Sequence, residues 1–242
     1  MLYYAVGDVH GCADALETLL AKIGRHARTL HEDREHRIVM LGDYVDRGPD
    51  SARVIDIIMK LDEDGHVVLP GNHDQMMHEA LSLKPGDAER AAALWWTNGA
   101  KATLKSYGAT RLSASRCWRS FDLVPPAHRD FLKRILEERP VYHLDREDGL
   151  FFVHAGVRPR KPLDAQSDEE LLWSRDPLFM GVDAEPWVEG LRVVHAHTPG
   201  EGPEIRANRV GLDTGAVYGG RLSAGVFVDG ALEEVLSVGG DA

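Results

Sequence analysis

Three short segments constrain the fold of this chain most. Each of them opens on glycine and follows an apolar run. They are Gly7-Asp8-Val9-His10-Gly11, Gly42-Asp43-Tyr44-Val45-Asp46-Arg47-Gly48 and Gly71-Asn72-His73-Asp74. The apolar runs at residues 2–6, 37–41 and 66–69 alternate with helical patterns at 13–23 and 52–61. This alternation predicts parallel strands joined by right-handed crossovers. The three segments should then meet at the C-terminal ends of neighbouring strands, where open α/β sheets bind ligands.

The rest of the chain divides into a helical part and a strand-rich part. Residues from about 75 to 138 are predicted to be mainly helical, with Trp95-Trp96 packed against the core, and to cap the site and set substrate access. Strands are expected at 141–144, 150–153, 192–195 and 209–212, with a hairpin-like pair near 222–238 and a surface loop at 158–170. We predict a single α/β domain over residues 1–242, built from two packed mixed sheets flanked by helices.

Composition excludes several classes of protein. The net charge of −11 makes the backbone of a nucleic acid a poor candidate for the main partner. No apolar run approaches the roughly 20 residues that a membrane span needs, and the first residues lack the basic region of a signal peptide. We therefore expect a cytoplasmic protein that uses no membrane and in which the two cysteines remain reduced.

The side chains of the three segments suit hard cations. Asp8 and His10 are two residues apart, so on an extended segment they point to the same side. Asp43 could bridge two cations about 3.5–4 Å apart, and Asn72 offers a neutral oxygen. A crevice that holds carboxylates, an amide and imidazoles predicts a site for two divalent cations.

The second half of the chain supplies further imidazoles. His154 follows an apolar run and precedes a glycine turn, in Phe152-Val153-His154-Ala155-Gly156. Two more candidates, His195 and His197, follow the apolar residues Val193-Val194. Together with the acidic segments, these residues predict a metal-dependent hydrolase of phosphate esters.

The ordered set GDVHG, GDYVDRG, GNHD, HAG and HTP resembles the PPP family of metal-dependent phosphoprotein phosphatases, within the calcineurin-like metallophosphoesterases. The later segments LWSR, at residues 172–175, and LDTGAVY, at residues 212–218, are similar to the small bacterial and phage branch, which includes the lambda phage phosphatase. The matching segments run from residue 7 to about residue 220. The resemblance implies the calcineurin-like fold and its two-metal site.

The resemblance also implies a ligand set. It assigns one metal to Asp8, His10 and Asp43, and the other to Asp43, Asn72, His154 and His197. Mn²⁺ is the expected metal, with iron and zinc as alternatives, because mixed nitrogen and oxygen sites suit several transition metals. The family has glycine where this chain has Ala196. His195 therefore remains an alternative to His197, which we favour because Thr198-Pro199 keeps the register of the motif.

The implied mechanism is direct hydrolysis. A hydroxide that bridges the two metals attacks phosphorus in line, with no phosphoenzyme. Arg47 and Arg175 bind the phosphoryl oxygens, by analogy with the family. His73 protonates the leaving oxygen, and Asp46 orients His73.

Four functions compete for this site. The first is a phosphatase acting on phosphorylated Ser, Thr or Tyr of proteins. The alternative is a symmetrical diadenosine tetraphosphate hydrolase, a group that commonly carries Ala where this chain has Asp46. A phosphodiesterase or nuclease, and a catalytically silent interaction module, are less favoured. The eukaryotic Ser-Ala-Pro-Asn-Tyr segment is absent from the sequence, so we expect no eukaryotic-type regulatory subunit.

Overall fold

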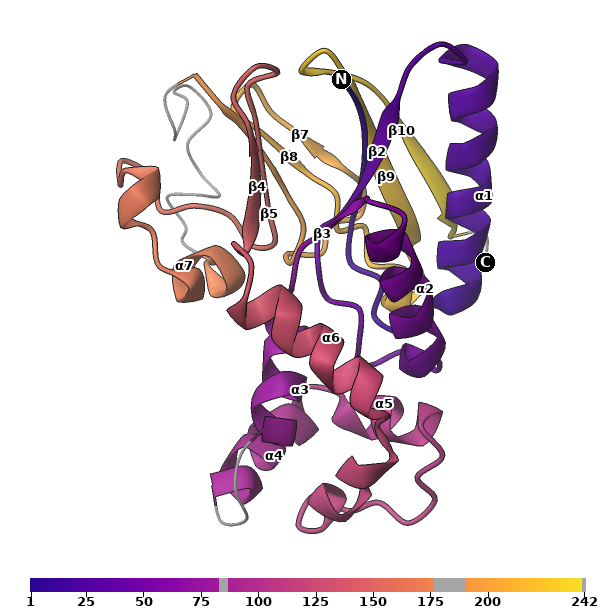
Figure 1. Ribbon diagram of the computed structural model, residues 1–242, viewed down its shortest axis with the longest axis vertical. Helices are drawn as coiled ribbons and strands as arrows, with labels where there is room; N and C mark the ends of the chain where they lie inside the picture. Colours follow the sequence, from indigo (N-terminus) through magenta and orange to yellow (C-terminus); the bar gives the residue numbers. More distant parts are fainter. Residues whose placement is uncertain (83–86, 176–189, 241–242) are drawn as a thin grey trace.

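The computed structural model describes residues 1–82, 87–175 and 190–240. Within these ranges the first sheet contains β1 (Leu2–Val6), β2 (His36–Met40), β3 (Val67–Val68), β9 (Arg221–Val228) and β10 (Ala231–Gly239). The strand order is β10-β9-β1-β2-β3, with β1, β2 and β3 parallel and β9 antiparallel to both of its neighbours (Figure 1). The predicted parallel core of this sheet is confirmed.

The second sheet is also mixed. It contains β4 (Tyr142–Asp145), β5 (Leu150–Val153), β6 (Arg192–His195), β7 (Glu204–Ile205) and β8 (Arg209–Gly211). The order is β4-β5-β6-β8-β7, with β5, β6 and β8 parallel and the two edge strands antiparallel. The α/β class with two mixed sheets is thus confirmed, and the predicted strands lie within one or two residues of observed ones, whereas the short edge strand β7 was not predicted.

One buried core joins the two sheets. Tyr3 and Val39 of the first sheet pack with Phe152 and Val194 of the second. Because side chains alternate along a strand, Tyr4 points to the opposite face and joins the core beneath the helices. The sheets are therefore held by apolar burial, and their C-terminal strand ends lie near one another.

Two helices cover the outer face of the first sheet. They are α1 (Ala13–Leu30) and α2 (Ser51–Glu63) (Figure 1). The helix α1 extends seven residues beyond the predicted end at residue 23, despite the cost of about 1 kcal/mol for Gly24 inside a helix. The last turns continue because His26 and Ala27 are buried, and the His26 Nδ1 lies 2.8 Å from the hydroxyl of Tyr4. Packing here overrides local propensity.

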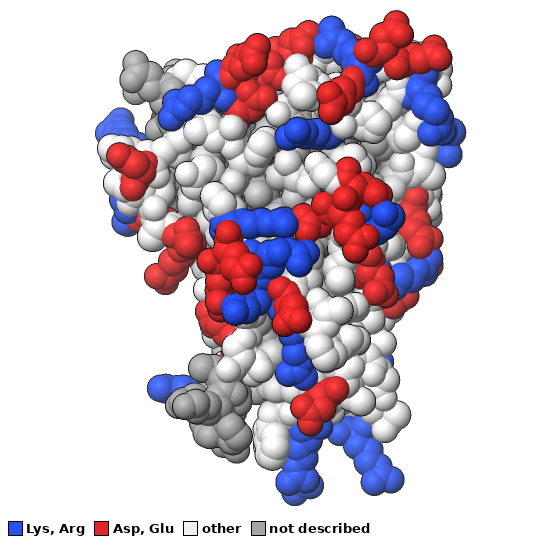
Figure 2. Space-filling model, viewed as in Figure 1, with Lys and Arg blue, Asp and Glu red and all other residues white. Residues whose placement is uncertain are grey.

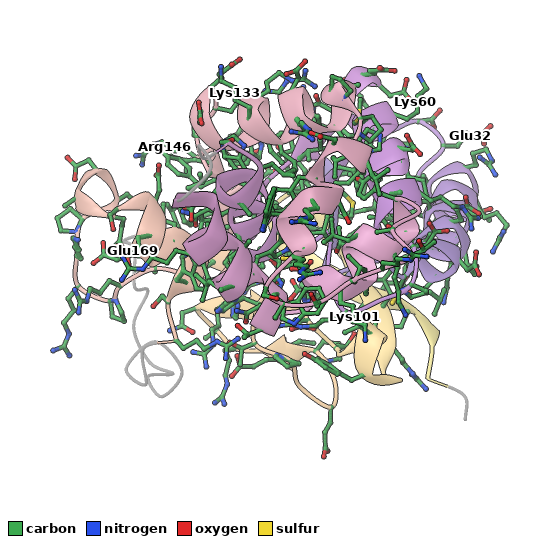
Figure 3. The ribbon with its side chains drawn as sticks, turned by 90° about the horizontal axis from the view of Figure 1, so that it is seen from below. Glu32, Lys60, Lys101, Lys133, Arg146 and Glu169 are labelled. Atoms are coloured by element: carbon green, nitrogen blue, oxygen red, sulfur yellow. The ribbon has the colours of Figure 1, made fainter. Side chains whose placement is uncertain are left out.

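The segment between β3 and β4 is helical, as the sequence predicts. It contains α3 (Asn72–Ser82), α4 (Asp87–Thr97), α5 (Ala100–Ser106), the short helix η1 (Cys117–Leu123) and α6 (Pro126–Glu137). These elements, which we call the cap, lie together below both sheets (Figure 1). Seen from below, they spread across the ends of the strands, with Lys133 of α6 on one side and Lys101 of α5 on the other (Figure 3).

Two local signals explain the remaining elements. Asp229 and Gly230 have φ values of 47° and 81°, which is the geometry of a tight hairpin turn, and they join β9 to β10. The expected loop at 158–170 is partly wrong, because η2 (Leu163–Ala165) lies within it and α7 (Asp168–Trp173) begins inside it. Ser167 and Glu170 form a capping box that starts α7.

The surface carries both signs of charge. On the face shown in Figure 2, basic and acidic side chains are interspersed, although the whole chain has a net charge of −11. This face offers no continuous basic surface for a nucleic-acid backbone. In the described residues, no helix has the length and apolar character needed to cross a bilayer.

Candidate metal centre

The backbone of the candidate site is unusual. Among the described residues, seven non-glycine residues have positive φ, and five of them belong to the predicted site. These five are His10 (43°), Asp43 (54°), Asp46 (75°), Arg47 (67°) and His197 (69°). Positive φ is costly for residues with a side chain, and such residues cluster at functional sites. The loops at the strand ends are therefore held in conformations that their sequences alone would not favour.

Glycine is required where these loops cross. A Cβ atom at Gly48 would collide with the carbonyl oxygen of His10. At Gly71 it would collide with the backbone nitrogen and the carboxylate of Asp43. The loops after β1, β2 and β3 thus touch through their backbones, which brings their polar side chains together.

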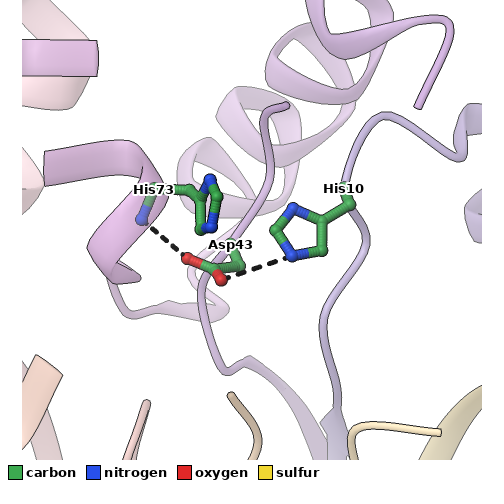
Figure 4. A group of neighbouring side chains, drawn as sticks. All are labelled: His10, Asp43 and His73. Carbon is green, nitrogen blue, oxygen red and sulfur yellow. Dashed lines mark hydrogen bonds and ion pairs between the residues drawn. The ribbon is translucent and has the colours of Figure 1, made fainter. Parts of the chain in front are cut away.

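The first group of ligand atoms surrounds His10. Its Nδ1 donates to the carbonyl oxygen of Val45 at 2.7 Å, so the lone pair of a neutral ring lies on Nε2. That Nε2 lies 3.4 Å from Oδ2 of Asp43 (Figure 4). It also lies 3.8 Å from Oδ2 of Asp8. Burial lowers the pKa of His10 to about 3. The ring is therefore neutral at pH 7 and able to donate its lone pair to a cation.

The second group surrounds His154. Its Nδ1 donates to the carbonyl oxygen of Leu41 at 2.8 Å. Its Nε2 lies 3.0 Å from Oδ1 of Asn72, 3.1 Å from Nδ1 of His197 and 3.4 Å from Oδ1 of Asp43. Burial lowers the pKa of His154, and burial together with the adjacent His154 lowers the pKa of His197 to about 2. This group also presents neutral imidazoles.

The donor set fits two cations that share Asp43. One oxygen of Asp43 faces His10 and the other faces His154. Around His154, the lone pair of Nε2 faces the oxygens of Asn72 and Asp43, and acceptors at such separations repel unless positive charge lies between them. Burial, with the neighbouring Asp213 and Asp43, raises the pKa of Asp8 well above its usual value. The site therefore concentrates negative charge that bound divalent cations would offset.

His73 clusters with His10 and Asp43 of the first group and also pairs with the buried Asp46. His73 Nδ1 lies 2.7 Å from Oδ2 of Asp46. The backbone N–H of His73 donates to Oδ1 of Asp43 at 2.9 Å (Figure 4). Burial alone would lower the pKa of His73, but the carboxylates of Asp43 and Asp46 raise it overall. The pair suits a group that holds a proton on the outer nitrogen of an imidazole.

Two arginines face the imidazoles from the rim. The guanidinium of Arg47 contacts Nε2 of His10 and lies 2.7 Å from Nε2 of His73. The Nε–H of Arg175 donates to Nε2 of His197 at 3.0 Å. Each guanidinium could instead donate to the oxygens of a phosphoryl group placed between them. The structure thus brings both predicted arginines to the predicted ligands.

Of the two histidines left open by the sequence, only His197 lies in the cluster. Its Nδ1 is 2.9 Å from Oδ1 of Asn72. His195 ends β6, and its Nδ1 lies 3.1 Å from the carbonyl oxygen of Ala196, with its ring against Gly211. Among the described residues, His195 joins neither group of candidate ligands.

Three residues of the site escaped the sequence analysis. The indole N–H of Trp95 donates to Asp46 at 2.8 Å, so this buried residue does more than pack against the core. Thr103 donates to the same carboxylate at 2.7 Å. Asp213 lies beside Asp8 and belongs to the LDTGAVY segment. That segment supports the family resemblance, but it did not indicate what Asp213 contacts. Trp95 and Thr103 carry no comparable motif.

Comparisons with known proteins identify the family and the fold. A family model described as calcineurin-like phosphoesterase matches residues 1–220. Curated relatives include the bis(5'-nucleosyl)-tetraphosphatase PrpE [asymmetrical] of Bacillus anthracis strain CDC 684 / NRRL 3495, which is 27% identical over 243 residues, covering 93% of this chain and 89% of the relative. The protein of the same name from Bacillus cereus strain AH820 has the same identity and coverage.

Solved structures share the fold. The crystal structure of a putative diadenosine tetraphosphatase superposes with a TM-score of 0.66 and 25% identity, covering 99% of this chain and 93% of the other. A protein serine/threonine phosphatase from Saccharomyces cerevisiae superposes with a TM-score of 0.55 and 14% identity, covering 100% and 80%. The second likeness shows a common fold alone.

Proposed function

This chain belongs to the calcineurin-like phosphoesterase family, and from that premise we propose that it is a metal-dependent phosphoprotein phosphatase acting on phosphoserine and phosphothreonine, and also on phosphotyrosine. The observation that supports this function is the buried pair of His73 and Asp46, 2.7 Å apart. An alkoxide that leaves from serine or threonine must gain a proton as its bond to phosphorus breaks. A fixed imidazole beside the candidate ligands can supply that proton.

The family uses a dinuclear metal centre, and the chain has two groups of residues able to hold it. We propose that one cation is held by Asp8, His10 and Asp43, and the other by Asp43, Asn72, His154 and His197. When bound, the two cations act as Lewis acids that lower the pKa of water and offset phosphoryl charge. We propose Mn²⁺, with iron and zinc as alternatives that the ligand chemistry also accepts.

The other side chains bind and position the substrate. Arg47 and Arg175 exchange their contacts with imidazole for contacts with the phosphoryl oxygens. Because Arg47 also lies against His73, a phosphoryl group bound by Arg47 would lie close to that ring, which could then protonate its leaving oxygen. Asp46 holds the ring and stabilises its positive charge. We further propose that the cap sets substrate access and that no eukaryotic-type regulatory subunit is needed.

A second candidate function is favoured by the relatives. It is the asymmetrical hydrolysis of a dinucleoside tetraphosphate, which divides four phosphates into a nucleoside monophosphate and a nucleoside triphosphate. The alternative weighed from the sequence was the symmetrical reaction, and the names of these relatives favour the asymmetrical one instead. A nucleotide leaves as a stabilised phosphate anion, so this reaction depends less on protonation by His73.

The deciding experiment compares two substrates. Initial rates are measured on a phosphoserine peptide and on diadenosine tetraphosphate, with Mn²⁺ and after chelation. The proposal expects metal-dependent release of phosphate from the peptide and little cleavage of the dinucleotide. Rapid formation of ATP and AMP, with no release of phosphate from the peptide, would replace it with the second candidate.

A further inference from the structure

The turn at Asp46 and Arg47 requires support from outside its own sequence. Both residues have positive φ, 75° and 67°, and a non-glycine residue in this region costs on the order of 1–3 kcal/mol. Asp46 is also completely buried. A turn that carries one proposed orienting carboxylate and one proposed phosphate-binding arginine is therefore unfavourable in isolation and must be held by its neighbours.

The neighbours that hold the Asp46 carboxylate belong to the cap. The indole N–H of Trp95, on α4, lies 2.8 Å and 3.0 Å from the two oxygens of Asp46. The hydroxyl of Thr103, on α5, donates to Oδ1 at 2.7 Å. With His73, the carboxylate thus accepts hydrogen bonds from three side chains. Such bonds fix the orientation of a buried carboxylate and favour its charged form.

The cap also holds the backbone of the turn. The N–H of Asp46 donates to the hydroxyl oxygen of Thr103 at 2.8 Å. Between α4 and α5, the carbonyl oxygen of Gly99 lies 3.5 Å from the backbone nitrogen of Arg47. Gly99 has φ of 121°, and a Cβ there would lie only 2.8 Å from that same nitrogen. Only glycine allows the cap to approach the turn this closely.

A purely structural role would not need these polar contacts. Trp95 is fully buried and packs against Phe121 at a ring separation of 5.8 Å. A phenylalanine could occupy most of the same volume. The indole N–H and the Thr103 hydroxyl both point to one carboxylate, which in turn contacts His73 and no other imidazole of the site. Their shared target indicates alignment of that carboxylate.

We propose that Trp95 and Thr103 are positioning residues: through them, and through the close approach of Gly99, the cap fixes the turn at Asp46 and Arg47 and so aligns His73 with the leaving group. This inference rests on the roles proposed above for His73 and Asp46. It gives α4 and α5 of the cap a part in the chemical step itself, in addition to the control of access proposed from their location. Both side chains are fully buried, so neither is placed to touch the substrate.

The test uses substitutions that retain volume. Trp95→Phe removes the N–H and keeps most of the ring, and Thr103→Val removes the hydroxyl and keeps the shape of the side chain. Thr103→Ser keeps a hydroxyl and should therefore retain the kcat that Thr103→Val loses. Trp96→Phe, on the same helix and only partly buried, is the matched control. Thermal melting and metal content are measured for every variant, so that loss of folding or of metal is recognised.

The readout is a double-mutant cycle with His73→Asn, on whichever of the two substrates the wild-type protein hydrolyses. If Trp95 acts through His73, Trp95→Phe should lower kcat about 10- to 100-fold in the wild-type background. It should then have less than about a threefold effect when His73 is already Asn. On a phosphate ester with an activated aryl leaving group, the single variant should lose less than on an alkyl phosphate, because less protonation is needed.

The possible outcomes are distinct. If the double variant loses the product of the two single losses in kcat, the positioning role is wrong. Equal losses of Trp95→Phe on aryl and alkyl phosphates would overturn it as well. If His73→Asn itself causes no loss of kcat, His73 is not the general acid. The proposed function is then wrong, whatever the contacts of Trp95 and Thr103. If Trp95→Phe does not fold, the comparison of Thr103→Val with Thr103→Ser decides the question by the same cycle.

Discussion

At the scale of single residues, hydrogen bonds to the backbone decide which nitrogen of each histidine faces the candidate site. His10 and His154 both give their Nδ1 hydrogen to a backbone carbonyl oxygen, of Val45 and Leu41 respectively. Each ring therefore presents Nε2 to Asp43 without rotating. Rings fixed in this way need little reorganisation to accept a cation, which is the role of outer contacts in many metal sites.

Asp43 should be the most sensitive ligand, because its two oxygens face different groups. We expect Asp43→Asn to reduce the turnover number to below roughly one-thousandth of the wild-type value. We also expect it to weaken the retention of both metals, measured by elemental analysis after desalting. Asp14→Asn is the control, since that carboxylate is 92% exposed and pairs with Arg53 on the surface. Near-normal activity of Asp43→Asn would contradict the bridging assignment.

The two histidines of β6 and its loop give a second test. His197→Ala should lose one of two bound metals, because its Nδ1 lies among the candidate ligands. His195→Ala should retain both, because that ring lies against Gly211. The same metal analysis decides between them. If only His195→Ala loses metal, His195 and not His197 is the ligand.

Most of the site was readable because its residues lie in short motifs after strands. Asp8, Asp43 and Asn72 follow three consecutive strands of one sheet, so topology alone brings them together. Trp95 and Thr103 lie on helices whose position over Asp46 depends on the packing of the whole cap. No local pattern encodes that packing, so these contacts could not be predicted.

At the scale of elements, one ionic cluster joins the cap to the helix beside the first sheet. Asp62 of α2 lies 3.0 Å from Arg134 of α6 and 2.5 Å from Arg139 just beyond it. The Asp62 side chain is 7% exposed, whereas both arginines are 40% exposed. Burial would raise the pKa of Asp62, but hydrogen bonds from Arg139 and Arg134 lower it overall.

Asp62→Asn should destabilise the protein by about 1–2 kcal/mol at pH 7, as judged by urea denaturation. Because the pKa of Asp62 is lower in the folded state, its contribution is fully present above the unfolded value near 3.9. The contribution disappears as the pH falls through the folded pKa, so wild type and variant should converge in acid. Asp64→Asn, whose exposed carboxylate pairs only with Lys60 among the described contacts, should change stability much less. An undiminished difference in acid would show that the loss does not arise from charge.

Most strands were predicted closely, because apolar runs bounded by glycine mark where a strand begins and ends. Helix ends were predicted less well. The helix α1 continues past residue 23 because Tyr4 and the sheet bury His26 and Ala27. In contrast, the start of α7 was encoded locally by Ser167 and Glu170, and the capping pattern was legible in the sequence.

At the scale of the whole molecule, the candidate ligands come from both sheets. Asp8 and Asp43 follow strands of the first sheet, whereas His154 and His197 follow strands of the second. The backbone N–H of His197 already donates to Oδ1 of Asp8 at 3.2 Å. Bound cations would therefore link the two halves of the core.

Removal of metal should consequently lower the melting temperature. A cation present at 100 times its dissociation constant stabilises the folded state by about 2.7 kcal/mol, which corresponds to roughly 5–10 °C for a chain of this size. Calorimetry with Mn²⁺ and after chelation measures the shift. The Asp43→Asn variant should show little response to the chelator. An equal response in that variant would locate the stabilising metal elsewhere.

The distance along the chain between Asp8 and His197 has a consequence for how the site comes to exist. A ribosome that has released the first 160 residues has produced the carboxylates and the imidazoles of His10 and His154, but not the imidazole of His197. The second group of ligands is completed only when the last parallel strands have joined their sheet. The cation held by the second group should therefore bind only chains that have already folded, so a cell short of that cation should accumulate folded, inactive protein.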